Sequence, residues 1–181
     1  MWSLGNETGH GICHDAAFGV AKAISPEIPV HYESCNGSDR KAYDIASNMY
    51  ERITSFYGEN PPPKYVRKDI INLDKPYFLC EYAHAMGVGP GSLEEYWDAF
   101  YSSDKYMGGC IWEWVDHAAC TYNKNLKYTY GGDHGERIHD SNFCVDGLIY
   151  PDRTPHTGAW EMKEAYRPIR IRHYEANEFF F

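Results

Sequence analysis

The sequence predicts an α/β fold with a parallel sheet, organised as part of a (β/α)8 barrel. Short apolar runs alternate with helical stretches, which is typical of βα units. Several of the runs end on an acidic residue, and in a (β/α)8 barrel the catalytic groups lie at the C-terminal ends of the strands. The five strand-like runs within 181 residues fall short of the eight strands and roughly 250 residues of a closed barrel.

The first part of the chain predicts three strands and two helices. The strands are expected at residues 1–4, 29–33 and 44–50, and the helices at residues 12–25 and 51–57. In the first helix, Ala16, Val20 and Ile24 recur at helical spacing. Pro26 and Pro29 then separate this helix from the second strand.

The second part of the chain predicts two more strands, at residues 75–81 and 107–114. Between them a glycine-rich connection leads to Ser92. This serine is expected to form a capping box with Glu95 at the start of an aromatic-rich helix. Residues 121–155 are rich in Gly, Asp, Asn and Tyr and are expected to form loops.

The last stretch of the chain has a different pattern, because isoleucine and arginine alternate over residues 169–172. Alternation of this kind predicts a β-strand with one exposed face. We therefore expect residues 1–166 to form the C-terminal part of a barrel, about strands 4 to 8, and residues 167–181 to begin a β-sandwich-type domain. The strands that would close the barrel are expected on the N-terminal side.

Composition argues against several classes of partner. The net charge of −9 disfavours nucleic acid, because phosphate binding needs a basic face. No apolar stretch approaches the roughly 18 residues of a membrane span, and no leader pattern is visible.

The six cysteines include no C-x-x-C pair, which argues against zinc-ribbon and thioredoxin-like sites. Cys80 and Cys110 lie in apolar runs and are expected to be buried. At this density of cysteine a disulfide framework is not expected, which favours a cytoplasmic location.

Four glutamates end or follow the expected strands: Glu7, Glu33, Glu81 and Glu113. Retaining hydrolysis of a glycosidic bond needs two carboxyl groups about 5–5.5 Å apart, one kept protonated and the other ionised. The pattern suits such a pair, and exposed surface acids are the alternative. The aromatic content of 16% leaves a similar choice, between a large core and aromatic faces that stack on a sugar.

Several ordered motifs carry a family resemblance. Residues 2–11, which read Trp-Ser-Leu-Gly-Asn-Glu-Thr-Gly-His-Gly, closely resemble the acid/base motif of the β-galactosidases of glycoside hydrolase family 2. Residues 80–87, which read Cys-Glu-Tyr-Ala-His-Ala-Met-Gly, are similar to that family's nucleophile motif. Further blocks at residues 108–116, 142–147 and 152–156 match in the family's order, so the resemblance covers nearly the whole chain.

The resemblance implies two catalytic glutamates. Glu7 would be the general acid and then the general base, and Glu81 would be the nucleophile that forms a galactosyl-enzyme. It also implies four residues of the substrate site: Asn6, Tyr50, His84 and Trp112.

Each of these four residues would have its own role by resemblance. Asn6 would bond the sugar 2-hydroxyl, and His84 another galactose hydroxyl. Tyr50 would bond the nucleophile and help to restore it as a leaving group. Trp112 would form an aromatic wall of the sugar pocket. Outside the motifs, the histidine and the tryptophan would be read as structural residues.

Metal ions follow from the resemblance too. Glu7 would bind Mg²⁺ together with two ligands upstream of this sequence. A Na⁺ or K⁺ ion would be held by the carbonyl of Phe143 and the side chain at position 146, which is Asp146 here and Asn in the family. Hard cations accept oxygen ligands of either kind. Val88 also replaces an Asn that is common in the family.

The resemblance therefore implies retaining hydrolysis of terminal non-reducing β-D-galactose residues, as in lactose catabolism. Full-length members of the family are often homo-oligomers. The alternatives are a catalytically silent fragment that needs the N-terminal part, a sugar-binding module, and a β-glucuronidase or β-mannosidase specificity. We expect the isolated 181-residue chain to be inactive on a nitrophenyl β-galactoside, because one side of its pocket would be missing.

Overall fold

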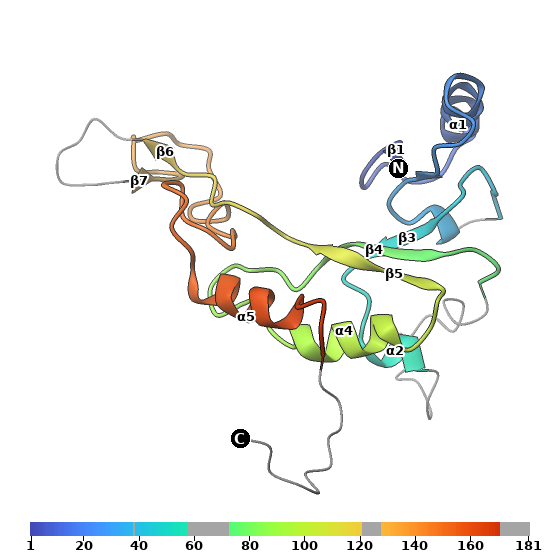
Figure 1. Cartoon of the computed structure of the whole chain (residues 1–181). Helices are drawn as coiled ribbons and strands as arrows, with labels where there is room; N and C mark the ends of the chain where they lie inside the picture. Colours follow the sequence, from blue (N-terminus) through green and yellow to red (C-terminus); the bar gives the residue numbers. More distant parts are fainter. Residues whose placement is uncertain (38, 58–72, 121–127, 171–181) are drawn as a thin grey trace, which may run out of the picture.

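The computed structural model describes residues 1–37, 39–57, 73–120 and 128–170 (Figure 1). The strands in chain order are β1 (Trp2–Ser3), β2 (Val30–His31), β3 (Ala46–Met49), β4 (Tyr77–Tyr82), β5 (Tyr106–Ile111), β6 (Ala119–Cys120) and β7 (Tyr128–Thr129). The helices are α1 (Ile12–Ile24), α2 (Thr54–Tyr57), α4 (Leu93–Tyr101) and α5 (Thr157–Ala165), with a 3-10 turn, η1, at Cys35–Gly37. All five strands predicted for the βα region are present.

The first five strands run parallel and lie side by side in sequence order. β1 pairs with β2, and β3, β4 and β5 form a three-stranded sheet. The carbonyl of Val30 accepts hydrogen bonds from the N–H groups of Asp44 at 2.8 Å and Ile45 at 3.2 Å, which joins the two sheets. A parallel bridge between Val115 and Ile149 continues the ladder past β5. This arrangement confirms the α/β, partial-barrel prediction.

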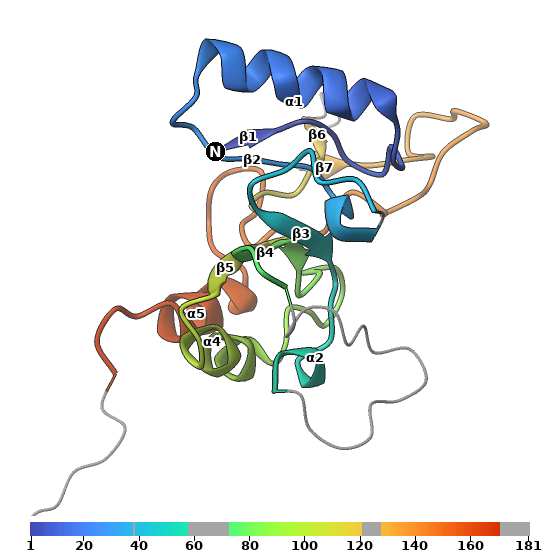
Figure 2. The ribbon, with the colours of Figure 1, turned by 90° about the vertical axis from the view of Figure 1, so that its right-hand side faces the viewer.

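In Figure 2 the parallel strands lie between α1 and the group formed by α2, α4 and α5. α1 lies over β1 and β2, whereas α2, α4 and α5 lie beyond β3, β4 and β5. α4 contacts α2, β5 and α5. The connections from β1 to β2, from β3 to β4 and from β4 to β5 each carry a helix, as in a barrel of βα units, whereas among the described residues between β2 and β3 only η1 is present.

The main core is largely aromatic, so much of the aromatic content serves packing. Phe56 meets Tyr77, Phe100 and Tyr106 edge-to-face, with ring-centroid distances of 5.8, 5.6 and 5.0 Å. Edge-to-face contacts of this kind add to the stability gained from burial alone. The buried members of this core are Tyr32, Cys35, Tyr43, Ala46, Phe56, Tyr77, Leu79, Tyr82, Leu93, Ala99, Phe100 and Ala165.

The capping box predicted at Ser92 is wrong. Its backbone is left-handed, with φ of 57°, and its side chain makes no cap hydrogen bond. A capping serine needs an extended backbone to direct its hydroxyl at the first free N–H groups of the helix. α4 instead begins at Leu93, whose fully buried side chain joins the main core.

No prediction from the sequence covers the residues of α5. Its buried residues are two alanines, Ala159 and Ala165, and its large apolar residue Trp160 is 59% exposed. The apolar stripe that identifies a helix in a sequence is therefore weak. β7 also lies inside the stretch that was predicted to be loop, where it pairs antiparallel with β6. Residues 121–127 lie outside the described part of the chain.

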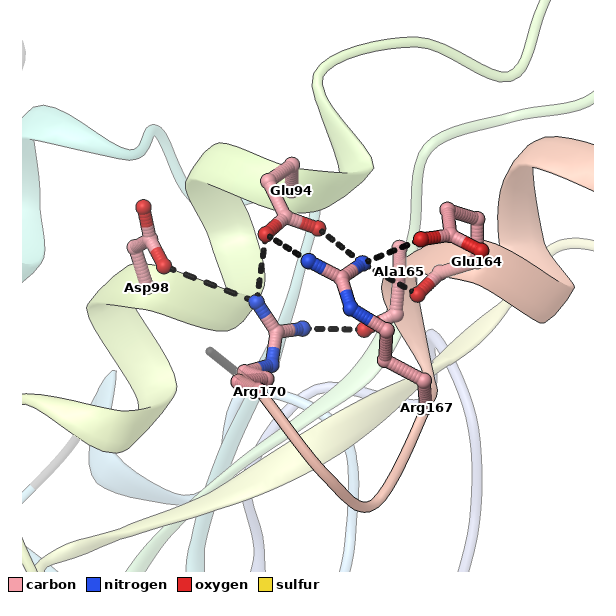
Figure 3. Close-up of polar contacts among 6 residues, drawn as sticks. All are labelled: Glu94, Asp98, Glu164, Ala165, Arg167 and Arg170. Carbon is pink, nitrogen blue, oxygen red and sulfur yellow. Dashed lines mark hydrogen bonds and ion pairs between the residues drawn. The ribbon is translucent and has the colours of Figure 1, made fainter. Parts of the chain in front are cut away.

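A network of charged groups, here called the arginine clamp, fastens the chain after α5 to α4 (Figure 3). Arg167 forms a bidentate pair with Glu94, at 3.2 and 3.3 Å, and Arg170 approaches Glu94 at 2.6 Å and Asp98 at 3.6 Å. Arg167 also contacts Glu164, at 3.1 Å. The guanidinium of Arg170 donates to the carbonyl of Ala165 as well.

The clamp reverses the burial expected from the alternating pattern. The side chain of Arg170 is 8% exposed, whereas Ile169 is 80% exposed. Residues 167–170 form no strand. Residues 171–181 lie outside the described residues, so the expected β domain stays a prediction.

The prediction for cysteine burial is wrong for Cys110, which is exposed, and Cys80 is half-buried. Both point toward the face of the parallel strands that the described residues leave uncovered, where Met107 is also 51% exposed. The five described thiols are free. Among the described residues, no helix is long and apolar enough to cross a membrane.

Leu79→Ala should lower the free energy of unfolding by about 2–5 kcal/mol, because Leu79 is fully buried and its loss leaves a cavity. Urea unfolding followed by tryptophan fluorescence measures the change. Val88→Ala is the control, since Val88 is fully exposed, and should change stability by less than about 0.5 kcal/mol. Equal effects of the two substitutions would contradict the assigned core.

Candidate active site

The carboxyl ends of the parallel strands meet at one edge of the ladder, and a pocket lies there. Its volume is about 250 Å³. Its lining comes from β1, β2, β4 and the segments that follow the first two of these strands: Ser3, Gly5, Asn6, His31, Glu33, Phe78, Cys80 and Glu81. Two predicted site residues, Asn6 and Glu81, therefore line the same pocket.

Glu81, near the end of β4, is held from the neighbouring strand by Tyr50. The N–H of Tyr50 donates to the carbonyl of Glu81 at 2.7 Å, and the phenol of Tyr50 interacts electrostatically with the Glu81 carboxylate. Tyr50 has a left-handed backbone, with φ of 51°, just past the end of β3. Such a conformation is uncommon for a tyrosine and turns its side chain out of the alternation of the strand.

The groups around Glu81 shift the pKa of its carboxyl in opposite directions. Burial raises the pKa of the Glu81 carboxyl, the phenol of Tyr50 lowers it, and the charges of Glu7 and Glu33 raise it again. Burial and the charge of Glu81 also raise the pKa of Tyr50. The phenol therefore remains protonated and can donate to the carboxylate throughout the neutral range.

Glu7 lies in the loop after β1. The carbonyl of Gly5 accepts a hydrogen bond from the N–H of Glu33 at 3.1 Å, which extends the pairing of the first two strands up to this loop. Glu7 is exposed and left-handed, with φ of 51°. Its charge acts on Glu81, so the fold brings the two predicted catalytic carboxyl groups to the same edge.

The other predicted residues gather around Asp146. His84 Nε2 lies 3.8 Å from Asp146 Oδ2, and Trp112 Nε1 donates to the same oxygen at 3.1 Å. The His84 ring centroid is 6.1 Å from that of Tyr50 and 5.8 Å from that of Phe143. Every residue assigned by resemblance thus lies at the carboxyl ends of the strands, and His84 links the Tyr50 side of the site to Asp146.

Three polar residues at this edge have no role by resemblance. Glu33 accepts a hydrogen bond from Ser34 and acts electrostatically on Glu81. Glu113 lies beside Asp146, and burial together with this neighbouring acid raises the pKa of Glu113. Both glutamates were visible in the sequence as strand-end acids. His31 was not foreseen, and its only signal was an inward position on β2.

The described residues do not form a complete Mg²⁺ site. Among them no group of three His, Cys, Asp or Glu side chains is placed to hold a metal ion. Glu7 can supply one carboxylate, and its exposure leaves that carboxylate accessible.

The surroundings of Asp146 fit a cation better. Asp146 is 3% exposed, and its Oδ1 atom is buried and receives no N–H or O–H donor among the described residues. The neighbouring carboxyl of Glu113 is close enough to share a proton with it. Asp146 is buried and the adjacent Glu113 is partly buried, so a cation at the unused oxygen of Asp146 would relieve the repulsion between the two carboxyl groups. The residues present therefore suit a Na⁺ or K⁺ ion.

Residues 1–171 match the family model described as glycosyl hydrolases family 2, TIM barrel domain. The chain belongs to glycoside hydrolase family 2. This family-2 chain is 42% identical over 182 residues to a β-galactosidase of Pseudoalteromonas haloplanktis, and 45% identical over 168 residues to one of Alteromonas mediterranea. The matches cover 98% and 90% of this chain. The chain spans only 17% and 16% of the length of these two relatives.

Solved structures of other glycosidases have a similar fold. A GH2 β-galacturonidase from Eisenbergiella tayi bound to galacturonate superposes with a TM-score of 0.55 at 17% identity, over 87% of this chain and 30% of that chain. A β-glucuronidase from Ruminococcus gnavus gives 0.51 at 16% identity, over 92% and 31%. At these identities the likeness shows the fold alone, and it agrees with the predicted barrel.

Tyr50→Phe should raise the pKa of Glu81, because it removes the hydroxyl that stabilises the ionised carboxylate. The ¹³C chemical shift of the Glu81 carboxyl, followed by NMR during a pH titration, measures the change. As acid is added, the variant should take up its proton at a higher pH than the wild type. Tyr101→Phe, on the exposed side of α4, should leave the titration unchanged. A midpoint at lower pH would contradict the assigned contact.

Proposed function

We propose that the protein carrying this chain hydrolyses terminal β-D-galactosyl residues of lactose-type β-galactosides with retention of configuration. The observation that carries the proposal is Glu81 at the end of β4, which lines the pocket and whose carbonyl accepts a hydrogen bond from the N–H of Tyr50 at 2.7 Å. Asn6 lines the same pocket. The relatives named β-galactosidase support the same specificity.

The first step of the proposed reaction is a displacement at the anomeric carbon. Protonated Glu7 gives its proton to the glycosidic oxygen, while ionised Glu81 attacks the carbon from the other side. The bond to the leaving alcohol breaks, and a covalent galactosyl-Glu81 ester forms. The phenol of Tyr50 interacts electrostatically with the attacking carboxylate.

The second step reverses the roles of the two acids. Glu7, now ionised, takes a proton from water, and the resulting oxygen nucleophile attacks the anomeric carbon. Glu81 leaves as a carboxylate, which the phenol of Tyr50 stabilises. Two inversions at one carbon give net retention of configuration.

Two cations belong to the proposal. Asp146 and the carbonyl of Phe143 would hold Na⁺ or K⁺, and Glu7 would be one ligand of Mg²⁺ with its other ligands outside these residues. When bound, such ions neutralise carboxylate charge and fix oxygen ligands in place. His84 lies between Asp146 and the ring of Phe143, and its ring would hydrogen-bond a galactose hydroxyl. The indole of Trp112 would form one side of the sugar pocket.

The charge of the site favours a neutral sugar over a uronic acid, which is the main alternative. Glu33 and Glu81 line the pocket. A carboxylate on the substrate would meet these like charges, and such juxtapositions are costly. The fold likeness to a galacturonidase therefore does not by itself point to a uronide substrate.

Replacing either proposed catalytic glutamate should abolish turnover in a way that identifies its role. Glu81→Ala should lower kcat/KM for a nitrophenyl β-galactoside by more than about 10⁴-fold, because no nucleophile remains. Glu7→Ala should lower kcat/KM by about 10²–10⁴-fold on a poor leaving group. The measurement uses the complete protein, including any sequence outside residues 1–181.

Added azide then separates the two roles. It should yield an α-galactosyl azide with Glu81→Ala and a β-galactosyl azide with Glu7→Ala, because it replaces the nucleophile in one case and water in the other. Glu95→Ala, on the exposed face of α4, is the control and should keep wild-type turnover. The same azide product from both variants would contradict the assignment.

The wild-type protein should prefer a nitrophenyl β-galactoside to the matching β-galacturonide at neutral pH, because of the acidic pocket. Glu33→Gln removes one negative charge from the pocket lining at nearly constant shape. The ratio of kcat/KM for the galactoside to kcat/KM for the galacturonide should fall by about tenfold, which corresponds to 1.4 kcal/mol. Glu95→Gln, at an exposed position of α4, is the matched control. A wild-type preference for the galacturonide would favour the uronidase alternative.

A further inference from the structure

The loop that carries Glu7 is closed by a contact from α1. Thr8 Oγ1 and His14 Nε2 lie 3.1 Å apart, at hydrogen-bonding distance. Gly5 packs against the same pair, since a Cβ atom at this position would lie 2.9 Å from Thr8 Oγ1 and 3.6 Å from His14 Nε2. The contact therefore ties Thr8, the residue after Glu7, to the first turn of α1.

His14 is itself held by the core. Its ring stacks on that of Tyr32, with a centroid distance of 4.2 Å and an interplanar angle of 21°. Tyr32 follows β2 and is fully buried. The N–H of His14 also donates to the carbonyl of Gly11 at 3.0 Å. The imidazole is thus a rigid link between the core below β2 and the hydroxyl of Thr8.

The side chain of Glu7 has little support of its own. Within the described ranges, no residue donates a hydrogen bond to its carboxyl group, and its backbone is left-handed. A left-handed glutamate is uncommon and persists where its surroundings hold it. The direction of this carboxyl group therefore depends on the neighbouring residues that fix the loop.

We propose that His14 is a positioning residue for the acid/base glutamate Glu7, acting through the hydroxyl of Thr8. The inference rests on the proposed function. His14 fixes the loop from the core side, and Thr8 passes that constraint to the residue before it. Proton donation by Glu7 depends on the placement of its carboxyl group within hydrogen-bond reach of the leaving oxygen.

A positioning role for His14 predicts that the loss of activity depends on the leaving group of the substrate. A poor leaving group such as phenol needs the proton from Glu7 in the first step, whereas 2,4-dinitrophenol departs without it. Thr8→Val and His14→Phe both remove the polar contact, and the phenyl ring keeps the stack on Tyr32. Each should lower kcat/KM for phenyl β-galactoside by about 10- to 100-fold. Each should change kcat/KM for 2,4-dinitrophenyl β-galactoside by less than about threefold.

Two further variants keep the test sharp. His14→Gln retains a hydrogen-bonding group near the position of Nε2 and should restore most of the phenyl galactoside activity lost in His14→Phe. His10→Phe is the control, because the His10 ring lies tilted at 6.1 Å from Tyr32, and it should leave the ratio of the two substrates unchanged. The Thr8→Val, His14→Phe double variant should equal the single variants, since both break one contact.

Amide hydrogen exchange supplies a readout that does not need activity. The peptide spanning residues 5–10 should exchange faster in Thr8→Val and His14→Phe than in the wild type and His10→Phe. Equal losses on both galactosides, or unchanged exchange of this peptide, would overturn the inference. A wild-type protein that hydrolyses neither galactoside would overturn the proposed function, and hydrogen exchange would then decide the positioning role alone.

Discussion

The parallel hydrogen-bonded ladder from β1 to β5 is the constraint on which the rest of the structure depends. Because neighbouring strands run in the same direction and follow sequence order, residues far apart in the chain reach one edge together. The bond from the N–H of Tyr50 to the carbonyl of Glu81 belongs to this ladder and also places the side chain of Glu81 beside the phenol of Tyr50. One backbone hydrogen bond therefore both pairs β3 with β4 and fixes the position of Tyr50 relative to Glu81.

The site concentrates negative charge where solvent is partly excluded, and the surrounding groups offset that cost. Burial raises the pKa of Glu81 while the hydroxyl of Tyr50 opposes the rise. The indole of Trp112 gives Asp146 one donor, and Asp146 Oδ1 receives none from the described residues. A buried carboxylate with an unused oxygen is unfavourable unless a proton or a cation joins it. A cation at this oxygen would therefore offset the cost of burying Asp146.

The sequence predicted the strands well because each is a compact apolar run flanked by turn residues, and strand order followed from the βα alternation. The motifs also located Glu7, Glu81 and Asn6 at one edge. Side-chain conformation was harder to predict. Ser92 has a left-handed backbone, and the next residue, Leu93, packs into the core. Local sequence propensities carry no information about such packing. Contacts such as Trp112 to Asp146 join residues 34 apart and follow only from the folded geometry.

The arginine clamp has a consequence for behaviour on heating. Removing charged groups from water becomes less costly as temperature rises, whereas the stabilisation from apolar burial levels off. A network of ion pairs therefore contributes relatively more to stability at high temperature. Arg170 is largely buried within this network, while Glu94 keeps contact with solvent. The ion pairs that join α4 to the chain after α5 should therefore weaken less on heating than their strength at room temperature suggests.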